Sequence, residues 1–279
     1  MQNAGMAALK LNWRYLAFDV HPDHLRAAIS GAQAMGFVGL NLTVPHKLLA
    51  VDLVDVLDET ARTWGAVNTI RFEGQDVDGL WKPVATFAEA PPQKLRTQGF
   101  NTDADAVTRS IREDLGIEIR GAKIILLGAG GAGRTAALKL AAEGAAELFL
   151  VNRTQAKVTG LIGEIAGRFP HVNARAGYPP PVQTVDLIVN ATSLGLKSDD
   201  APPFDATQYS LAKAGAAYDM IYRPAETAWL RTAKAAGCRT ANGIGMLLHQ
   251  GAKALELWSG LNPPIEVMRE ALTQNIYGR

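Results

Sequence analysis

A lysine and an aspartate end two short polar motifs of the sequence. Lys47 closes NLTVPHK, which follows a mostly apolar run, and Asp103 closes GFNTD, just before a predicted helix. An enzyme that oxidises an alcohol by hydride transfer must also move the hydroxyl proton, and a lysine oriented by a carboxylate suits that task. We therefore interpret Lys47 and Asp103 as a candidate catalytic pair. The alternative is that Lys47 is an ordinary residue at a helix start.

A glycine-rich hexapeptide lies between the apolar strand KIILL and the helix RTAALKLAAEG, and it fits the pattern G-x-G-x-x-G. In that pattern the first glycine makes a tight turn, the second admits a pyrophosphate, and the third lets the helix pack against the strand. The helix N-terminus offers N–H groups and a partial positive charge to the phosphates. The motif predicts a dinucleotide site at Gly128, Ala129, Gly130, Gly131, Ala132 and Gly133.

The next predicted strand ends in Asn152, Arg153 and Thr154. A fold that binds NAD often has an acid at this point, which holds the ribose hydroxyls. An arginine there can pair with a 2′-phosphate, which an acid would repel. These residues favour NADP as the cofactor, although Arg153 can also be read as a solvated loop residue.

Composition excludes several other classes of function. The chain has 279 residues, 48% hydrophobic and 20% charged, and a formal net charge of +1, which gives no reason to expect a nucleic-acid or membrane partner. No apolar run reaches the roughly 18 residues of a membrane span, and the N-terminus lacks the pattern of a secretory signal. The one cysteine, Cys238, permits no internal disulfide and suits a cytoplasmic location. The five histidines show no metal-ligand spacing, so we predict no metal site.

The order of predicted elements alternates between strand and helix. The N-terminal part is expected to contain strands at Trp13–Val20, 37–44 and 66–72, and helices at 1–10, 21–36 and 46–65. This rhythm predicts a parallel α/β layer. Residues 74–98 break it with glycine, proline and polar residues, and we expect a long loop or a small excursion there.

Eight motifs, in this order, make the chain similar to the shikimate dehydrogenases: NLTVPHK, GAVNT, GFNTD, GAGGAGRT, VNRT, VNATSLG, YDMIYRPAET and ANGIGMLLHQGA. The resemblance implies reversible reduction of 3-dehydroshikimate with NADPH, in the biosynthesis of chorismate and the aromatic amino acids, with Lys47 and Asp103 as the catalytic pair. It also implies a two-domain α/β fold: a substrate domain (1–103, with the atypical insertion 74–98), a Rossmann NADP domain (104–241) and C-terminal helices that return to the substrate domain (242–279).

The resemblance assigns further site residues by their place in the matching motifs. Thr43, Asn68 and Asp103 would hydrogen-bond the substrate hydroxyls, and Tyr222 and Gln250 would touch the substrate from across the cleft. Five more would lie along the nicotinamide side of the cofactor: Asn190, Ala191, Thr192, Gly243 and Met246. Taken alone, Asn68 could cap a turn, Tyr222 could be a strand-end aromatic, and Gln250 could lie on a solvated helix face.

The chain departs from the family pattern in two places. Family members begin with a strand and a serine loop, G-x-P-[IV]-x-H-S-x-S-P, that binds the substrate carboxylate, whereas this sequence starts at Met1-Gln2-Asn3-Ala4. We expect unpaired backbone groups on the strands beside the missing one. An internal start, a natural truncation, or a substitute from the insertion, with a strand in WKPVATF and Lys82 as carboxylate partner, would each explain the difference. The insertion 74–98 is itself the second departure, and a lid, a specificity element and a surface excursion stay open for it.

Two alternatives to an NADP-dependent shikimate dehydrogenase remain at this stage. One is a quinate or quinate/shikimate dehydrogenase of the same family. The other is a nucleotide-binding homologue with impaired catalysis, which the absent serines suggest. A monomer and a homodimer are both compatible with the sequence.

Overall fold

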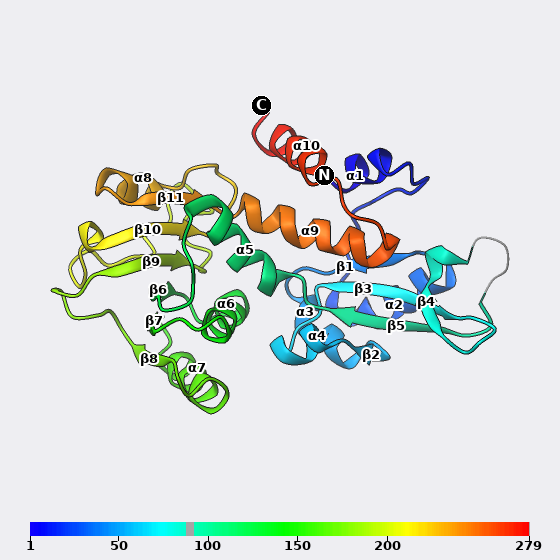
Figure 1. Ribbon diagram of the computed structural model, residues 1–279, viewed down its shortest axis with the longest axis horizontal. Coiled ribbons are helices and arrows are strands. Elements are labelled where there is room, and N and C mark those ends of the chain that lie inside the picture. Colours follow the sequence, from blue (N-terminus) through cyan, green and yellow to red (C-terminus); the bar gives the residue numbers. More distant parts are fainter. Residues whose placement is uncertain (88–91, 279) are drawn as a thin grey trace. The chain divides into compact units, whose positions relative to one another are not determined.

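The computed structural model describes residues 1–87 and 92–278, and the chain divides into two compact units (Figure 1). Unit 1 comprises Met1–Asp103 and Leu248–Arg279, and unit 2 comprises Ala104–Leu247. The division falls in helices α5 (Asp103–Leu115) and α9 (Ile244–Ser259). The boundaries expected for the substrate domain, the cofactor domain and the returning helices stay a prediction.

The sheet of unit 1 has the strand order β1-β3-β5-β2, and β4 pairs with β3. The strands are β1 (Gly39–Asn41), β2 (Val56–Leu57), β3 (Thr69–Gln75), β4 (Trp81–Pro83) and β5 (Leu95–Phe100). β3 is antiparallel to β1, β4 and β5, so the prediction of a wholly parallel layer was wrong for this unit. For β3 and β4 the reason is that a short turn joins them, and strands joined by a short turn pair antiparallel.

Helices lie against both faces of this sheet. Their bounds are α1 (Gln2–Ala8), η1 (Pro22–His24), α2 (Leu25–Ala34), α3 (His46–Leu49), η2 (Ala50–Asp52), α4 (Glu59–Trp64), η3 (Val84–Thr86) and α10 (Ile265–Tyr277). Residues of α2 and α4 form a buried apolar cluster with Ile70 and Phe72 of β3. From α9, the Trp258 indole donates a hydrogen bond to the Ile70 carbonyl at 2.9 Å.

Two predictions for the N-terminal part were wrong. Residues 13–20 form no strand, because no described strand pairs with this segment; the N–H and C=O of Tyr15 instead bond the Asn3 side chain at 2.7 and 3.0 Å. The helix expected at 46–65 is interrupted by β2, which pairs with β5, and it restarts at α4, where Asp58 accepts from the Ala61 N–H. Tertiary strand pairing overrode the local helical pattern here.

Within 74–98 both ends belong to the sheet, because β3 runs to Gln75 and β5 begins at Leu95, so the expected loop or excursion is wrong for 74–75 and 95–98. Between these ends, the described residues form a small excursion at the edge of the sheet. β4 and η3 follow a tight turn after β3, and residues 88–91 lie outside the described residues. The strand expected in WKPVATF is confirmed only at Trp81–Pro83. The excursion packs tightly, since a Cβ on Gly74 would lie 2.5 Å from the Pro92 side chain.

Unit 2 is built on a parallel sheet of order β11-β10-β9-β6-β7-β8. Its elements are β6 (Lys123–Leu127), α6 (Gly131–Ala142), β7 (Glu147–Val151), α7 (Gln155–Arg168), β8 (Asn173–Ala176), β9 (Val185–Asn190), η4 (Leu211–Lys213), β10 (Ala214–Asp219), α8 (Ala228–Ala235) and β11 (Arg239–Asn242). This is the doubly wound order 3-2-1-4-5-6, with its switch point between β6 and β9. The Rossmann prediction is therefore confirmed.

Two glycines of unit 1 give opposite expectations when changed to alanine. A Cβ on Gly39 would lie 2.1 Å from Trp258 Nε1 and 2.5 Å from the Ile70 carbonyl oxygen, so Gly39→Ala must break the bond between them and should cost about 1–3 kcal/mol of stability. Gly31, inside α2, has open space around it, so Gly31→Ala should stabilise by about 0.5–1 kcal/mol. Urea unfolding of both variants measures this, and equal midpoints would contradict the packing described for Trp258.

Candidate active site

Lys47 and Asp103 form an ion pair in unit 1. Lys47 Nζ donates to Asp103 Oδ2 at 2.8 Å, and the side chains are 28% and 15% exposed. Lys47 lies in the short helix α3, whose position is fixed by a bond from the Val67 N–H to the Lys47 carbonyl at 2.8 Å. Asp103 is the first residue of α5. Both groups are partly shielded yet reachable from solvent, which a proton-transfer pair needs.

The amide of Asn68 organises the polar groups next to this pair. Its Oδ1 accepts from the Thr102 N–H at 2.8 Å and from the Thr69 hydroxyl at 3.2 Å, and its Nδ2 donates to the Thr102 hydroxyl at 2.9 Å. Asn68 is 2% exposed. The oxygen and one N–H are therefore used in the network around Thr102, and Nδ2 also donates to Gln250 Oε1 at 3.5 Å, a long bond that an acceptor on a ligand can replace.

The other residues assigned to the substrate lie in different places. In unit 1, Gln250 of α9 contacts Asn68 through its side chain. Thr43 is exposed and lies next to Leu42, whose N–H donates to the Asn68 carbonyl at 2.8 Å. Tyr222 belongs to unit 2, on the loop after β10, and is 38% exposed. Within unit 1, hydrogen bonds join Lys47 to Asp103 and Asn68 to Gln250, and Asn68 also bonds Thr102, the residue before Asp103.

The suggestion that Lys82 replaces the missing carboxylate clamp has no support in the structure. The Lys82 ammonium is held by Asp76 at 2.6 Å within the excursion itself. This interaction raises the pKa of Lys82 and lowers the pKa of Asp76, through their hydrogen bond first of all. The lysine therefore serves the local turn.

Asn101 is a supporting residue that the sequence interpretation missed. It is 3% exposed; its Oδ1 accepts from the Asp103 N–H at 3.1 Å, and its Nδ2 donates to the Ala66 carbonyl at 3.1 Å. Thr60 Oγ1 accepts from the Asn101 N–H at 2.9 Å, which ties α4 to the start of α5. The signal was available, because an asparagine directly before the predicted helix, which starts at Thr102, is typical of helix capping.

In unit 2 the glycine motif forms the turn between β6 and α6. Gly128 has a φ of +104°, and a Cβ on Gly133 would lie 2.1 Å from the Gly128 carbonyl oxygen. Gly130 is the N-cap residue of α6 and, as a glycine, supplies no side-chain cap to the N–H groups of that helix end. The backbone is thus shaped as a phosphate-binding turn requires, with N–H groups available to an anion.

Asn152 and Arg153 have different relations to this turn. Asn152 Oδ1 accepts from the Ala129 N–H at 3.1 Å and its Nδ2 donates to the Thr154 carbonyl, so its amide holds the glycine turn against the loop after β7. Arg153 is exposed, and it has no ion-pair partner in the part of the chain that the structure describes. α7 begins next to it, capped by Thr154 and with no acid in its first turn. This end of β7 therefore suits an anion.

The remaining residues assigned to the cofactor lie at the same edge of the sheet. Asn190 ends β9, Gly243 follows β11, and Met246 is in the first turn of α9. A Cβ on Gly128 would lie 2.9 Å from the Thr192 side chain and 3.0 Å from the Ala191 carbonyl, so the loops after β6 and β9 touch. Because all these strands are parallel, their carboxyl ends form one crevice at the switch point, where such folds bind ligands.

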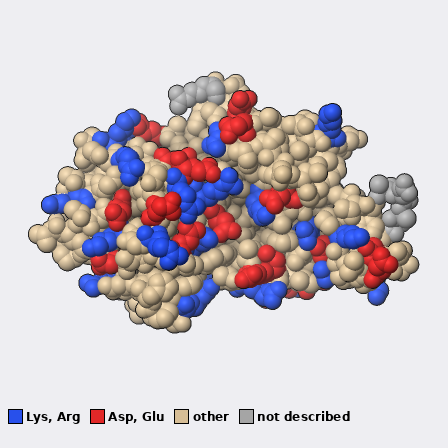
Figure 2. All heavy atoms as spheres, in the orientation of Figure 1, with Lys and Arg blue, Asp and Glu red and all other residues tan. Residues whose placement is uncertain are grey.

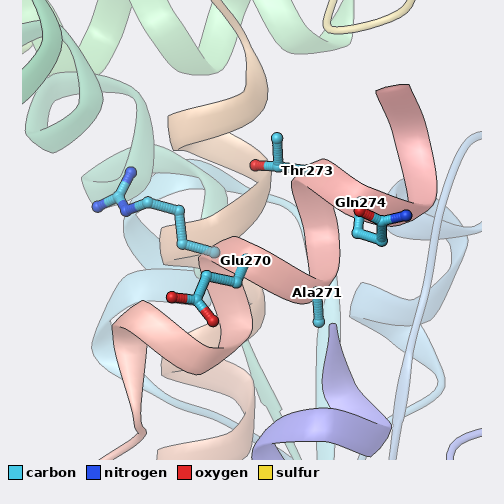
Figure 3. Close-up of a pocket in the computed structure, with 5 residues that line it drawn as sticks. Glu270, Ala271, Thr273 and Gln274 are labelled. Carbon is cyan, nitrogen blue, oxygen red and sulfur yellow. The ribbon is translucent and has the colours of Figure 1, made fainter. Parts of the chain in front are cut away.

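Other surface features carry no comparable chemistry. A hollow of about 530 Å³ is lined by α10 residues, several of which Figure 3 shows as sticks, and none is a predicted site residue. Basic and acidic side chains are interspersed on the face in Figure 2. Within residues 1–87 and 92–278, no helix is long and apolar enough to cross a membrane, and no three His, Cys, Asp or Glu residues form a metal cluster.

A doubly wound sheet with a phosphate-binding glycine turn, in a chain that also carries a lysine–carboxylate pair, defines a dinucleotide-dependent oxidoreductase. Family models match three stretches of the chain: the substrate-binding domain of shikimate dehydrogenase at residues 1–70, shikimate/quinate 5-dehydrogenase at 110–196, and the C-terminal domain of shikimate 5′-dehydrogenase at 243–273.

Relatives and solved structures agree with these matches. A shikimate dehydrogenase (NADP⁺) of Methanopyrus kandleri is 38% identical, over 99% of this chain and 90% of the relative. A crystal structure of shikimate dehydrogenase in complex with NADP⁺ has a TM-score of 0.81 at 34% identity, over 98% of this chain and 89% of its own. A ligand-free 5-ketofructose reductase of Gluconobacter has a TM-score of 0.78 at 31% identity, over 99% of this chain and 92% of its own. The chain belongs to the shikimate dehydrogenase family.

The glycine turn predicts a contrast between two neighbouring variants. Gly133→Ala should lower stability by about 1–3 kcal/mol, because its Cβ would overlap the Gly128 carbonyl. Gly131→Ala meets nothing within 4 Å and should leave thermal unfolding unchanged. Scanning calorimetry of both proteins measures the difference, and an unaltered Gly133→Ala midpoint would contradict the close approach of strand and helix.

Proposed function

We propose that this chain catalyses the reversible NADP-dependent oxidation of shikimate to 3-dehydroshikimate, a step of aromatic amino-acid biosynthesis. The Lys47–Asp103 pair at 2.8 Å, in a chain whose second unit has a dinucleotide-binding crevice, carries the proposal. Membership of the family supports the choice of substrate. A cytoplasmic location and a monomeric or homodimeric state stay predictions from the sequence.

The residues of unit 2 fit NADP. The glycine turn offers N–H groups at the start of α6, and the close approach at Gly133 keeps that helix end against β6. Arg153 and the acid-free start of α7 suit a 2′-phosphate. NADP, when bound, accepts or supplies the hydride. Asn152 would act through the turn it holds, and Asn190, Ala191, Thr192, Gly243 and Met246 would lie on the nicotinamide side.

In unit 1, Asp103 holds the Lys47 ammonium, and the pair would handle the hydroxyl proton. An ammonium has three N–H groups; one donates to Asp103, and the others can reach a substrate hydroxyl. The Nδ2 N–H of Asn68 that donates to Gln250 would donate to a second substrate hydroxyl instead, with Thr43, Gln250 and Tyr222 as further contacts. When the substrate alcohol is oxidised, the carbinol hydrogen leaves as hydride and the hydroxyl proton must pass to a group with a lone pair, which is the Asp103 carboxylate or Lys47 in its neutral amine form.

Quinate remains a second candidate substrate because the model matched at residues 110–196 covers both shikimate and quinate dehydrogenases. The similar Gluconobacter protein is a 5-ketofructose reductase, so a protein of this fold can act on a different hydroxy-ketone. A homologue with impaired catalysis would bind NADP and turn over neither acid. Assays with shikimate and quinate, each with NADP⁺ and NAD⁺, separate these possibilities.

Replacing Lys47 tests the catalytic pair directly. Lys47→Ala should lower kcat for NADPH formation on shikimate by about 100- to 10,000-fold, the usual share of a general acid–base group, while NADP⁺ still binds. Lys82→Ala is the matched control, since that lysine is engaged with Asp76, and it should keep the parent rate. Unchanged turnover in Lys47→Ala would end the role given to this lysine.

Replacing Arg153 tests the cofactor assignment. Arg153→Asp places an acid where the 2′-phosphate is expected, so the ratio of kcat/KM for NADP⁺ over NAD⁺ should fall at least about tenfold, equivalent to ~1.4 kcal/mol. Arg175→Asp changes the same charge at exposed β8 and serves as the control. If the two variants shift the ratio equally, Arg153 does not recognise the phosphate.

A further inference from the structure

Asp219 is a fully buried carboxylate that ends β10 in unit 2, and no motif assignment explains it. Its relative exposure is 0%. Three groups donate to it: Asn190 Nδ2 at 3.0 Å, the Ile221 N–H at 3.0 Å and the Thr227 hydroxyl at 2.7 Å. All three are uncharged donors, so the arrangement suits an acceptor-only carboxylate without a counter-ion.

Burying a carboxylate without a cation is costly, and burial raises the pKa of Asp219 as its largest effect. An apolar residue, or a hydroxyl, would fill this place at lower cost if only packing were required. The fold retains the carboxylate where it meets donors from three directions. We therefore infer that the carboxylate is needed to hold these three donor groups in fixed positions.

The three donors belong to different parts of the crevice edge. Asn190 ends β9, and its Oδ1 accepts from the N–H and hydroxyl of Thr192 at 3.0 and 2.7 Å, which sets the loop after β9. Ile221 lies in the loop after β10, next to Tyr222. Thr227 caps α8, accepting from the Leu230 N–H. One carboxylate thus joins two strand-end loops and a helix start.

The loop after β11 depends on the same arrangement. The Gly243 N–H bonds the Ile221 carbonyl at 3.1 Å, and a Cβ on Gly243 would lie 2.2 Å from the Met220 carbonyl oxygen. Gly243 therefore fits closely against the segment that Asp219 fixes. A shift of residues 220–221 must move Gly243, the residue that precedes α9.

We propose that Asp219 is a positioning residue that holds the loops after β9, β10 and β11 in the arrangement that receives the nicotinamide half of NADP. This inference rests on the proposed function, which places Asn190, Thr192 and Gly243 along the nicotinamide. Asp219 itself does not touch the cofactor. The glycine turn and Arg153, which would hold the adenosine half and the phosphates, are not among the residues that bond Asp219 in the described part of the chain, and they should not depend on it.

The test compares binding of whole NADPH with binding of 2′,5′-ADP, which has the adenosine half and the 2′-phosphate but no nicotinamide. Asp219→Asn keeps the shape and removes the charge, so one donor must turn away or lose its acceptor. The Kd for NADPH should rise about tenfold in this variant, while the Kd for 2′,5′-ADP stays within about twofold. The fluorescence of bound NADPH should shift toward that of the free cofactor, because the nicotinamide is held less tightly.

Two further variants keep the test decisive if Asp219→Asn folds poorly. Thr227→Val removes one donor and should reproduce the selective loss of NADPH affinity, whereas Thr227→Ser keeps the hydroxyl and should restore it. Asp186→Asn is the matched control, because Asp186 is an exposed carboxylate of β9 that accepts a hydrogen bond from the Lys123 N–H at 2.8 Å. This variant should leave the Kd of both NADPH and 2′,5′-ADP unchanged.

The outcomes separate the inference from the function on which it rests. An equal loss of affinity for NADPH and for 2′,5′-ADP would show general destabilisation and overturn the positioning role. Unchanged affinity for both ligands would also overturn it. If the unaltered chain bound neither NADPH nor 2′,5′-ADP, the cofactor assignment itself would fall. Selective loss of NADPH, with rescue by Thr227→Ser, supports the assignment of Asp219.

Discussion

The buried amide of Asn68 is the interaction on which the arrangement of unit 1 depends. Its donor and acceptor engage the backbone and hydroxyl of Thr102, and so join the start of β3 to the segment that leads into α5. Asp103 is the next residue, and its direction toward Lys47 follows from that attachment. An unpaired amide at this depth would be costly, so the network holds the residues in one arrangement.

Unit 2 holds its site residues in position by other interactions than those of unit 1. Five of its parallel strands end next to loops with assigned residues, and the chain keeps those loops together through close backbone approaches and one buried carboxylate. Glycines at 128, 133 and 243 permit approaches that any side chain would block. The asparagines at 152 and 190 use their amides to fix turns. The crevice is thus prepared by the protein before a ligand enters.

Much of unit 2 was predictable because its signals are local. The strand–glycine turn–helix unit, the apolar strand 123–127 and the amphipathic helix at 155–168 each carry their own pattern, and the parallel order follows from the alternation. Unit 1 was predicted less well. The segment at 13–20 was predicted as a strand but pairs with no strand among the described residues, and Val56–Leu57 became a strand because β5 lies beside it. Neither outcome is written in the local residues.

By itself, the sequence determined the family, the cofactor class and the identity of the candidate catalytic pair, because residue types in ordered motifs specify chemistry directly. The tertiary structure decided which side chains support that pair. Thr102 carries no chemical signature of its own, and its role comes from contact with Asn68, 34 positions away. The same holds in unit 2 for Asp219, which bonds Asn190, 29 positions away. Such contacts form only when strands and helices pack, since hydrogen bonds between distant segments depend on the fold that buries them.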